Sequence, residues 1–368
     1  MGRTAFGSLG YSEEQVELMD VATAFCRERS PIDRVRGLIV EDRGFDPAIW
    51  QEIADLGWLG IAIAEEFGGV GLGMAEVVPV AEQMGRTLMA GPFAACTIAA
   101  QILMAAGSDA QKAEWLPRIV AGEIVVPALV EADCGWNLAG NSAHAEGGQL
   151  AGQKCFVPHA DAAAAILVAL DGNFAIVERA AIGEHALRRE TIIDETRRTF
   201  ALSLDGIALG DEALMQADRF AAALEQAELC ALLLQAAEMC GGAQAVIDYT
   251  LDYLRTRKQF GKLIGEYQAL KHPIADAYVA YENARSHLYA AAHSFGDQGQ
   301  GEIATRMAKA SADKAYAFAA DRAIQFHGGF GFTHDCDAGL HRRAAIWQAS
   351  QFGDAAWQRA CLADLILS

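Results

Sequence analysis

The chain has 368 residues, a formal net charge of −19 and a composition that is 52% hydrophobic. Such acidity argues against nucleic acid as the main partner, because a phosphate backbone requires basic surface. No stretch approaches eighteen strongly apolar residues without charges, so we expect no membrane-spanning helix. The acid-rich first thirty residues do not resemble a secretory signal, and the eight cysteines lack a metal-ligand spacing. These features predict a cytoplasmic protein with reduced thiols, no metal site and no membrane association.

Residues 1–119 are expected to form an N-terminal helical domain. Ser12 and Gln15 have the spacing of a capping box at the start of a helix over 13–29. The glycine-rich segment 65–73 resembles a dinucleotide-binding loop, but its flanks have helical rather than strand periodicity. We therefore interpret it as a connector.

Residues 120–215 change to short runs rich in Val, Ile, Leu and Phe, separated by turn residues. Asp171-Gly172 between two apolar runs predicts a hairpin turn. An antiparallel β domain is the expected structure of this part of the chain.

Helical periodicity returns over residues 216–368, in long segments joined by short loops. The expected helices are 218–254, 266–296, 299–326 and about 336–364. Antiparallel helices of this kind indicate a four-helix bundle. The predicted fold class is mainly α with a central β domain.

Two segments carry residues suited to a phosphate-bearing ligand. RTRKQFGKLIGEYQALKH at 255–272 places Arg257 among other cations, and guanidinium groups suit bidentate phosphate contacts. Its alternative role is a helix C-terminus, where basic residues complement the dipole. AIQFHGGFGFTHD at 323–335 has glycines that allow close approach to the backbone, or that simply end a helix. Gln325 and His327 are able to hydrogen-bond a polar ring edge, although a single histidine more often has a structural role.

These segments, with LGWLGIAIAEEFGGVGLG at 56–73 and GQKCFVPHA at 152–160, resemble the acyl-CoA dehydrogenase family over nearly the whole chain. The R-K-Q-F-G and Q-F-H-G-G-F-G-F-T stretches are specific in combination. The resemblance implies the acyl-CoA dehydrogenase fold and an acyl-CoA substrate. It also implies an FAD held between the subunits of a dimer of dimers, with electron-transfer flavoprotein as the electron acceptor.

The resemblance further implies eight FAD-contacting residues at two ends of the cofactor. Those near the pyrophosphate and adenosine of an FAD in the partner subunit are Arg257, Gln259, Phe260, Gln268, Gln325, Gly328 and Gly329. Phe156 would lie against the isoalloxazine, where the family usually has tryptophan.

The family reaction needs a carboxylate that removes the α-proton of the thioester while a hydride leaves for the flavin. By resemblance, the two positions that supply this base are Phe352 and Ala231, and neither is acidic. Glu228 lies one helical turn before Ala231 and is the best local replacement. In a chain with 48 acids, however, such a residue is more often a solvated surface group.

Three further differences from the family also weaken the flavin site. Val130, Trp136 and Pro158 replace hydroxyl-bearing residues of the family, and each replacement removes a hydrogen bond to flavin or substrate. The pattern is similar to the base-less subunits of heterotetrameric acyl-CoA dehydrogenases from bacterial steroid side-chain degradation. Three functions stay open. One is an FAD-dependent acyl-CoA dehydrogenase of fatty acid or steroid side-chain catabolism, active as a homo-oligomer (dimer or tetramer) or as part of a heterotetramer with a second acyl-CoA dehydrogenase subunit. Another is a non-catalytic FAD-binding or structural partner subunit. The third is an oxidase or monooxygenase on the same fold.

Overall fold

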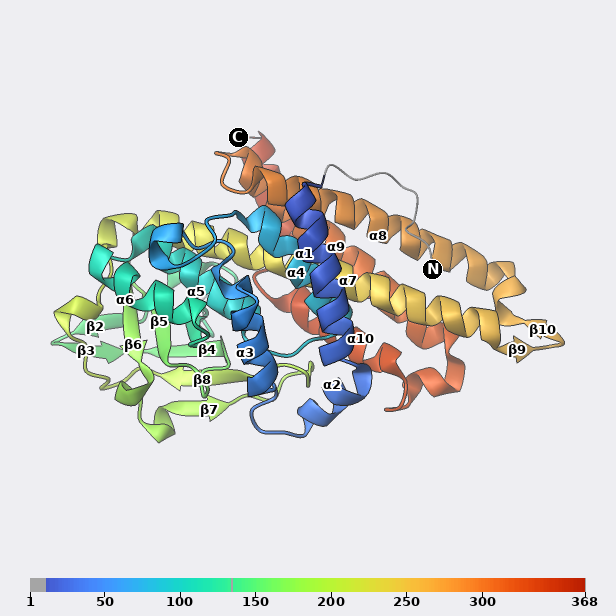
Figure 1. The fold of residues 1–368 in the computed structure, drawn as a ribbon, viewed down its shortest axis with the longest axis horizontal. Helices are drawn as coiled ribbons and strands as arrows, with labels where there is room; N and C mark the ends of the chain where they lie inside the picture. The colour runs from blue at the N-terminus through green and yellow to red at the C-terminus, as the bar shows by residue number, and fades with distance from the viewer. Residues whose placement is uncertain (1–10, 134, 368) are drawn as a thin grey trace.

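The computed structural model describes residues 11–133 and 135–367 and shows helices, then strands, then long helices (Figure 1). The N-terminal helices are α1 (Glu13–Arg29), α2 (Ile32–Ile39), α3 (Pro47–Asp55), α4 (Met74–Arg86), α5 (Phe93–Ala106) and α6 (Asp109–Val120). The capping box of α1 is confirmed, because Ser12 Oγ accepts from the Gln15 amide and Gln15 Oε1 accepts from the Ser12 amide, both at 3.1 Å. Cys26, Cys96, Cys230, Cys240, Cys336 and Cys361 are free thiols, and Cys134 lies outside the described residues.

The strands between α6 and α7 form two three-stranded sheets and a small hairpin. The first sheet has the order β1 (Val125–Ala128), β5 (Ala165–Leu170), β6 (Asn173–Glu178), and the second has the order β4 (Gln153–Pro158), β8 (Thr199–Ser203), β7 (Leu187–Arg189). The hairpin joins β2 (His144–Glu146) to β3 (Gln149–Ala151). Asp171-Gly172 turns the chain between the antiparallel strands β5 and β6, as predicted.

The β domain is mainly antiparallel, as predicted, but one pair of its strands is parallel. β1 runs parallel to β5, with Val125 opposite Ala165. A parallel pair needs a long connection, and the chain between β1 and β5 supplies it by passing through β2, β3 and β4. The sheet is therefore mixed.

The C-terminal helices are α7 (Phe220–Thr256), α8 (Gln268–Ser294), α9 (Gln300–Phe326), α10 (Asp337–Ser350) and α11 (Ala355–Leu367). The single helix expected over about 336–364 is wrong, because it is broken at residues 351–354. Phe352 and Gly353 have φ of 53° and 91°, which end α10, and Asp354 then caps α11 by accepting from the Ala356 and Trp357 amides.

Between α7 and α8, the hairpin of β9 (Lys258–Gln259) and β10 (Lys262–Leu263) projects from the end of the bundle opposite the strands of the β domain (Figure 1).

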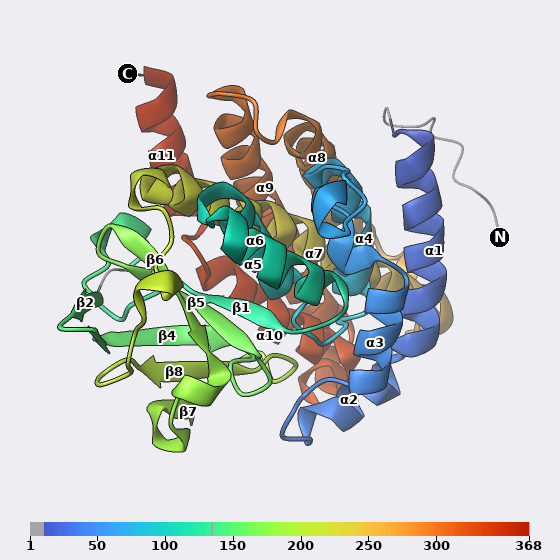
Figure 2. The same ribbon diagram turned by 60° about the vertical axis from the view of Figure 1, so that its left-hand side comes forward.

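Helix α7 is the central element of the molecule. The stretch Ala217–Thr256 is long and apolar enough to cross a membrane by length and composition, but 83% of its most apolar window is buried inside the protein. It packs against α4, α5, α8 and α9, and α5 also packs on β1 (Figure 2). One end of α7 therefore lies beside the strands, and the other end reaches the β9–β10 hairpin.

A buried ion pair holds the loop after β1 to β4. Lys154 Nζ lies 2.6 Å from Glu131 Oε1, and the Ser142 amide and hydroxyl donate to Glu131 Oε2 at 2.9 and 2.7 Å. Burial opposes ionisation of the Glu131 carboxyl, but these donors outweigh it and lower its pKa to about 2. A carboxylate with this environment stabilises the fold only while it is ionised.

We expect Glu131→Gln to lower the free energy of unfolding by about 3–5 kcal/mol at pH 7, because it leaves the Lys154 charge buried without its carboxylate. The folded pKa is depressed, so this contribution is complete above about pH 4.5 and disappears as the pH falls towards 2. Urea unfolding at pH 7 and pH 3 should show the gap between wild type and variant narrowing in acid. The double variant Glu131→Gln/Lys154→Met is the control and should lose less. A difference in unfolding free energy between wild type and Glu131→Gln that does not change with pH would contradict a stabilising role for the ionised Glu131 carboxylate.

Candidate functional site

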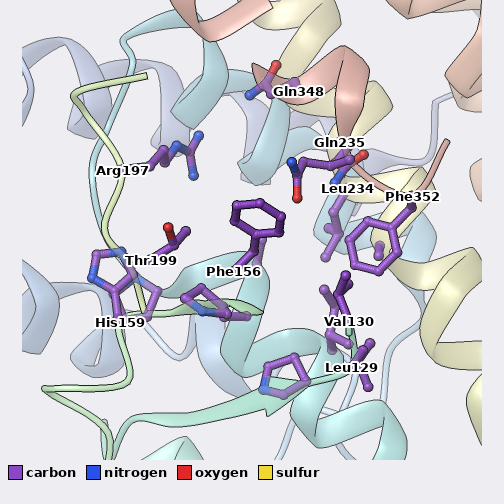
Figure 3. A pocket seen from close by; sticks show the side chains of 18 of the residues that line it. Leu129, Val130, Phe156, His159, Arg197, Thr199, Leu234, Gln235, Gln348 and Phe352 are labelled. Atoms are coloured by element: carbon purple, nitrogen blue, oxygen red, sulfur yellow. The ribbon is translucent and has the colours of Figure 1, made fainter. Parts of the chain in front are cut away.

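A cavity lies where β1, β4 and α5 meet α7 and α10 (Figure 3). The apolar residues that line it include Leu129, Val130, Phe156, Ala231, Leu234 and Phe352. The polar residues that line it include His159, Arg197, Thr199, Gln235, Glu238 and Gln348. In Figure 3 the Phe156 ring stands between Arg197 and Thr199 on one side and Leu234 and Phe352 on the other.

Phe156 reaches this cavity because β4 is irregular. The register of β4 against β8 shifts between Lys154 and Val157, and Phe156 has a φ of 55°. A bulge of this kind re-aims a side chain, and positive φ is costly for a bulky residue. The ring meets that of Trp347 edge-on at 5.3 Å, and the Phe156 amide donates to Glu190 Oε2 at 2.9 Å. The structure thus directs Phe156 into the cavity, where the sequence predicted a ring-binding residue.

The cavity wall has no carboxylate at either of the two positions that supply the base in the family, as the sequence predicts. Ala231 and Phe352 both line the cavity. Glu228 is not part of the lining, because its Oε1 lies 3.1 Å from Arg306 Nη1 on α9. Burial raises the pKa of Glu228 above its ordinary value, although Arg306 opposes the shift. The structure therefore does not bring Glu228 to the site.

Glu228 instead belongs to a buried polar network that fixes the loop between α10 and α11. Arg306 Nη1 also donates to Gln358 Oε1 at 3.0 Å, and Gln358 Nε2 donates to the Phe352 carbonyl at 2.6 Å. Lys309 Nζ donates to the carbonyls of Gln348 and Gly353 at 3.2 and 3.4 Å. Burial lowers the pKa of Lys309 to about 8. This network keeps the Phe352 side chain in the cavity.

Sequence analysis missed one carboxylate on the cavity wall, that of Glu238. Its Oε2 accepts from Arg197 Nη2 at 2.7 Å and from Gln348 Nε2 at 2.9 Å. The available signal was helical spacing, since Glu238 follows Ala231 by seven residues and so shares its face of α7. Arg197 and Gln348 are also on the cavity wall, so the Glu238 carboxylate is hydrogen-bonded to its neighbours there.

A second site, a groove of about 900 Å³, lies at the other end of α7. The β9–β10 hairpin, the start of α8 and the turn after α9 form its walls. Five predicted residues line it: Arg257, Gln259, Phe260, Gly328 and Gly329. Gln268 and Gln325 do not line the groove, and their side chains are exposed at the first turn of α8 and the last turn of α9. No group of three or more His, Cys, Asp or Glu that could hold a metal occurs in the described residues.

Comparisons with known proteins agree with this geometry. The acyl-CoA dehydrogenase N-terminal domain model matches residues 12–123, and the C-terminal domain model matches residues 231–366. Acyl-CoA dehydrogenase FadE12 of Mycobacterium tuberculosis is 32% identical over 311 residues, which cover 78% of this chain and 79% of that protein. The chain belongs to the acyl-CoA dehydrogenase family. It is an oxidoreductase of that family, and the family's cofactor is FAD.

Other relatives and solved structures are similar over the full length. Acyl-CoA dehydrogenase IpdE2 of M. tuberculosis is 27% identical, covering 90% of this chain and 91% of that one. The Tcur3481-Tcur3483 steroid ACAD G363A variant is 28% identical with a TM-score of 0.85, covering 98% and 99% of the two chains. The ChsE4-ChsE5 complex from M. tuberculosis is 23% identical with a TM-score of 0.86, covering 98% and 99%. The predicted fold, with a β domain between two helical parts of the chain, is confirmed.

The residues present fit FAD at both sites. In the groove, Arg257 offers a cation, and a Cβ at Gly328 or Gly329 would meet nothing within 4 Å, so the turn is open to a ligand. In the cavity, three buried polar atoms have no hydrogen-bond partner within the described part of the chain: His159 Nδ1, Thr199 Oγ1 and Gln348 Oε1. Buried polar atoms are normally satisfied, so these suit a ligand with a polar ring edge.

Proposed function

We propose that this chain is the base-less subunit of a heterotetrameric acyl-CoA dehydrogenase, in which a second subunit brings the catalytic carboxylate. The observation that carries the proposal is the absence of an ionisable side chain at Ala231 and Phe352, which both line the cavity. Two similar structures are described as two-protein assemblies, Tcur3481-Tcur3483 and ChsE4-ChsE5, which supports the same arrangement here.

Acyl-CoA dehydrogenation requires a base within hydrogen-bond reach of the α-proton of the thioester. FAD, when bound, supplies the acceptor for the hydride that leaves the β-carbon. In this chain the cavity residues bind and orient a ring and an apolar group, and Phe352 occupies the place of a base. Glu238 is held by Arg197 and Gln348, so it is poorly placed to take a proton from a substrate.

The position of the groove supports a shared cofactor. The cavity reaches Glu238 of α7 and the groove begins at Tyr253, so their nearest points are separated by roughly 22 Å of helix at 1.5 Å per residue. The two sites are therefore separate on this chain, which supports a groove that serves an FAD whose ring lies in the partner subunit. Phe260 and Phe332 are 93% and 81% exposed at this end, as expected of a surface that another subunit covers.

The remaining assignments belong to the same proposal. Similarity to the Tcur3481-Tcur3483 steroid ACAD favours the CoA thioester of a steroid side chain over an ordinary fatty acid. We place the assembly in the cytoplasm, with electron-transfer flavoprotein as its electron acceptor.

Co-expression with an acyl-CoA dehydrogenase encoded beside this chain tests the proposal. The expected result is a yellow mixed tetramer that an acyl-CoA bleaches under anaerobic conditions, whereas the chain alone gives little or no bleaching. A yellow homo-oligomer that acyl-CoA bleaches fully would contradict the proposal. A yellow protein that consumes oxygen without acyl-CoA would indicate an oxidase or monooxygenase.

Arg257→Ala is expected to weaken FAD retention by about 10- to 150-fold, because a charge-assisted contact contributes about 1.5–3 kcal/mol. The flavin released on ultrafiltration of the assembled protein measures this loss. Arg255→Ala is the matched control, since it removes the same charge at the same end of α7 from a residue that does not line the groove. Equal flavin content in the two variants would count against the groove as the FAD site.

A further inference from the structure

The groove contains a histidine, His327, to which the family resemblance and the proposed function assign no role. His327 directly follows α9 and precedes the glycine turn, and only 3% of it is exposed. Its ring stacks on Tyr249 and Tyr253 of α7, with ring centroids 4.7 and 4.3 Å apart and interplanar angles of 12° and 29°. The two tyrosine rings fix the orientation of the imidazole.

The hydrogen-bonding state of this imidazole follows from its neighbours. Nδ1 lies 2.8 Å from the Ala323 carbonyl oxygen, which only accepts, so Nδ1 carries the proton. Nε2 of the neutral ring then has a lone pair. Burial lowers the pKa of His327, although the Ala323 carbonyl and Asp337 oppose the shift, so the neutral ring predominates at pH 7.

His327 Nε2 is buried and has no hydrogen-bond partner in residues 11–133 or 135–367. Such an atom is uncommon in a folded protein and calls for an explanation. His327 lines the same groove as Arg257, Gly328 and Gly329. An acceptor therefore lies beside a cation and a turn that is open to a ligand.

We propose that His327 Nε2 accepts a hydrogen bond from the adenosine end of FAD. The donor is either the exocyclic amine of the adenine or a ribose hydroxyl, because both groups can donate a hydrogen bond to the Nε2 lone pair. His327 is then a residue that selects adenosine in the groove, while Arg257 contributes charge without selecting the base. This inference rests on the proposed use of the groove for FAD.

His327→Phe tests the inference, because phenylalanine keeps an aromatic ring against both tyrosines and removes the acceptor. The expected result is a 3- to 10-fold loss of affinity for FAD in the assembled protein and for ADP in the purified chain, measured by calorimetry. The thermal midpoint of the flavin-free protein should fall only by the small contribution of the Nδ1 hydrogen bond to the Ala323 carbonyl, since Nε2 has no hydrogen-bond partner in the described residues. His327→Gln, which restores an acceptor, should recover part of the affinity.

Nucleotide analogues identify the donor. If the adenine amine donates, wild type binds ADP more tightly than IDP, which has a carbonyl at that position, and His327→Phe loses the preference. If a ribose hydroxyl donates, IDP binds as well as ADP, and the deoxy analogue of ADP that lacks that hydroxyl shows the loss instead. Unchanged FAD and ADP affinity in His327→Phe, with a loss in Arg257→Ala, would overturn this inference and leave the proposed function standing. No loss in either variant would remove the groove from FAD binding altogether.

If His327→Phe does not fold, the wild-type protein with ¹⁵N-labelled histidine provides the same test. The Nε2 resonance of His327 should move on addition of ADP, in the direction of an accepted hydrogen bond, while exposed histidines such as His272 stay unchanged. An Nε2 resonance that does not move at saturating ADP would overturn the inference.

Discussion

We expect the purified chain, assayed alone, to dehydrogenate acyl-CoA about 10²–10⁴-fold more slowly than the mixed tetramer, because general-base catalysis contributes about that factor. Glu228→Gln should leave the turnover of the mixed tetramer unchanged, since the Glu228 carboxylate faces Arg306 rather than the cavity. Its effect should be confined to a small loss of stability, because Arg306 keeps a second partner in Glu302 at 2.8 Å. Anaerobic flavin reduction by an acyl-CoA measures the rate without depending on the electron acceptor.

A variant that gains a carboxylate in the cavity tests the same assignment. Phe352→Glu places a carboxylate in the cavity at the loop position from which the family supplies its base, and the chain alone should then show turnover. Phe352→Gln is the control, since glutamine has the same size as glutamate, meets the same backbone φ of 53° at this position and does not ionise. Strong turnover by the wild-type homo-oligomer that survives Glu228→Gln would contradict both the base-less assignment and any role for Glu228 as the base.

The groove was largely predictable, because the sequence motifs on either side of it carry both of its chemical features. Arg257 and the turn at Gly328-Gly329 are about 70 residues apart in the sequence, and the structure brings them to one groove. Gln268 and Gln325 belong to the same motifs but lie outside the lining. A motif identifies a segment, whereas the direction of a side chain at the end of a helix depends on neighbours that the motif does not specify.

The case of Glu228 shows a different limit. Helical spacing correctly relates it to the face of α7 that carries Ala231 and Glu238. The spacing does not show how far along α7 the cavity extends. One turn before Ala231, Glu228 faces Arg306 of α9 instead of the cavity. Glu238, one turn past Leu234 in the other direction, does reach the cavity wall.

The structure departs from the predicted elements in two places, and both departures arise from contacts between residues that are far apart in the sequence. The pairing of β1 with β5 follows from how the chain between them is routed, which local periodicity does not reveal. The break between α10 and α11 lies in a stretch that keeps helical periodicity on both sides. It is stabilised by donors on α9 and α11, among them Lys309 and Gln358.

Gly241→Ala should be strongly destabilising, because α4 and α7 cross with their backbones in contact. A Cβ at Gly241 would lie 1.8 Å from the Glu82 carbonyl oxygen, and one at Gly85 would lie 2.2 Å from the Glu238 carbonyl oxygen. Backbone atoms on both sides leave no flexible side chain to move aside, so the helices must separate. Overpacking typically costs about 1–3 kcal/mol, and a clash with a helix backbone belongs at or above the upper end.

Separating these helices would also disturb the buried carboxylate of Glu82, which accepts from Arg285 Nε at 2.7 Å and Tyr289 Oη at 2.6 Å. We therefore expect Gly241→Ala to lower the urea midpoint substantially and to shift the α7 residues that line the cavity. Gly37→Ala is the matched control, because an added Cβ there meets nothing within 4 Å and alanine favours helix α2 by about 0.5–1 kcal/mol. Equal midpoints for Gly241→Ala and wild type would show that α4 and α7 tolerate a wider spacing than this packing implies.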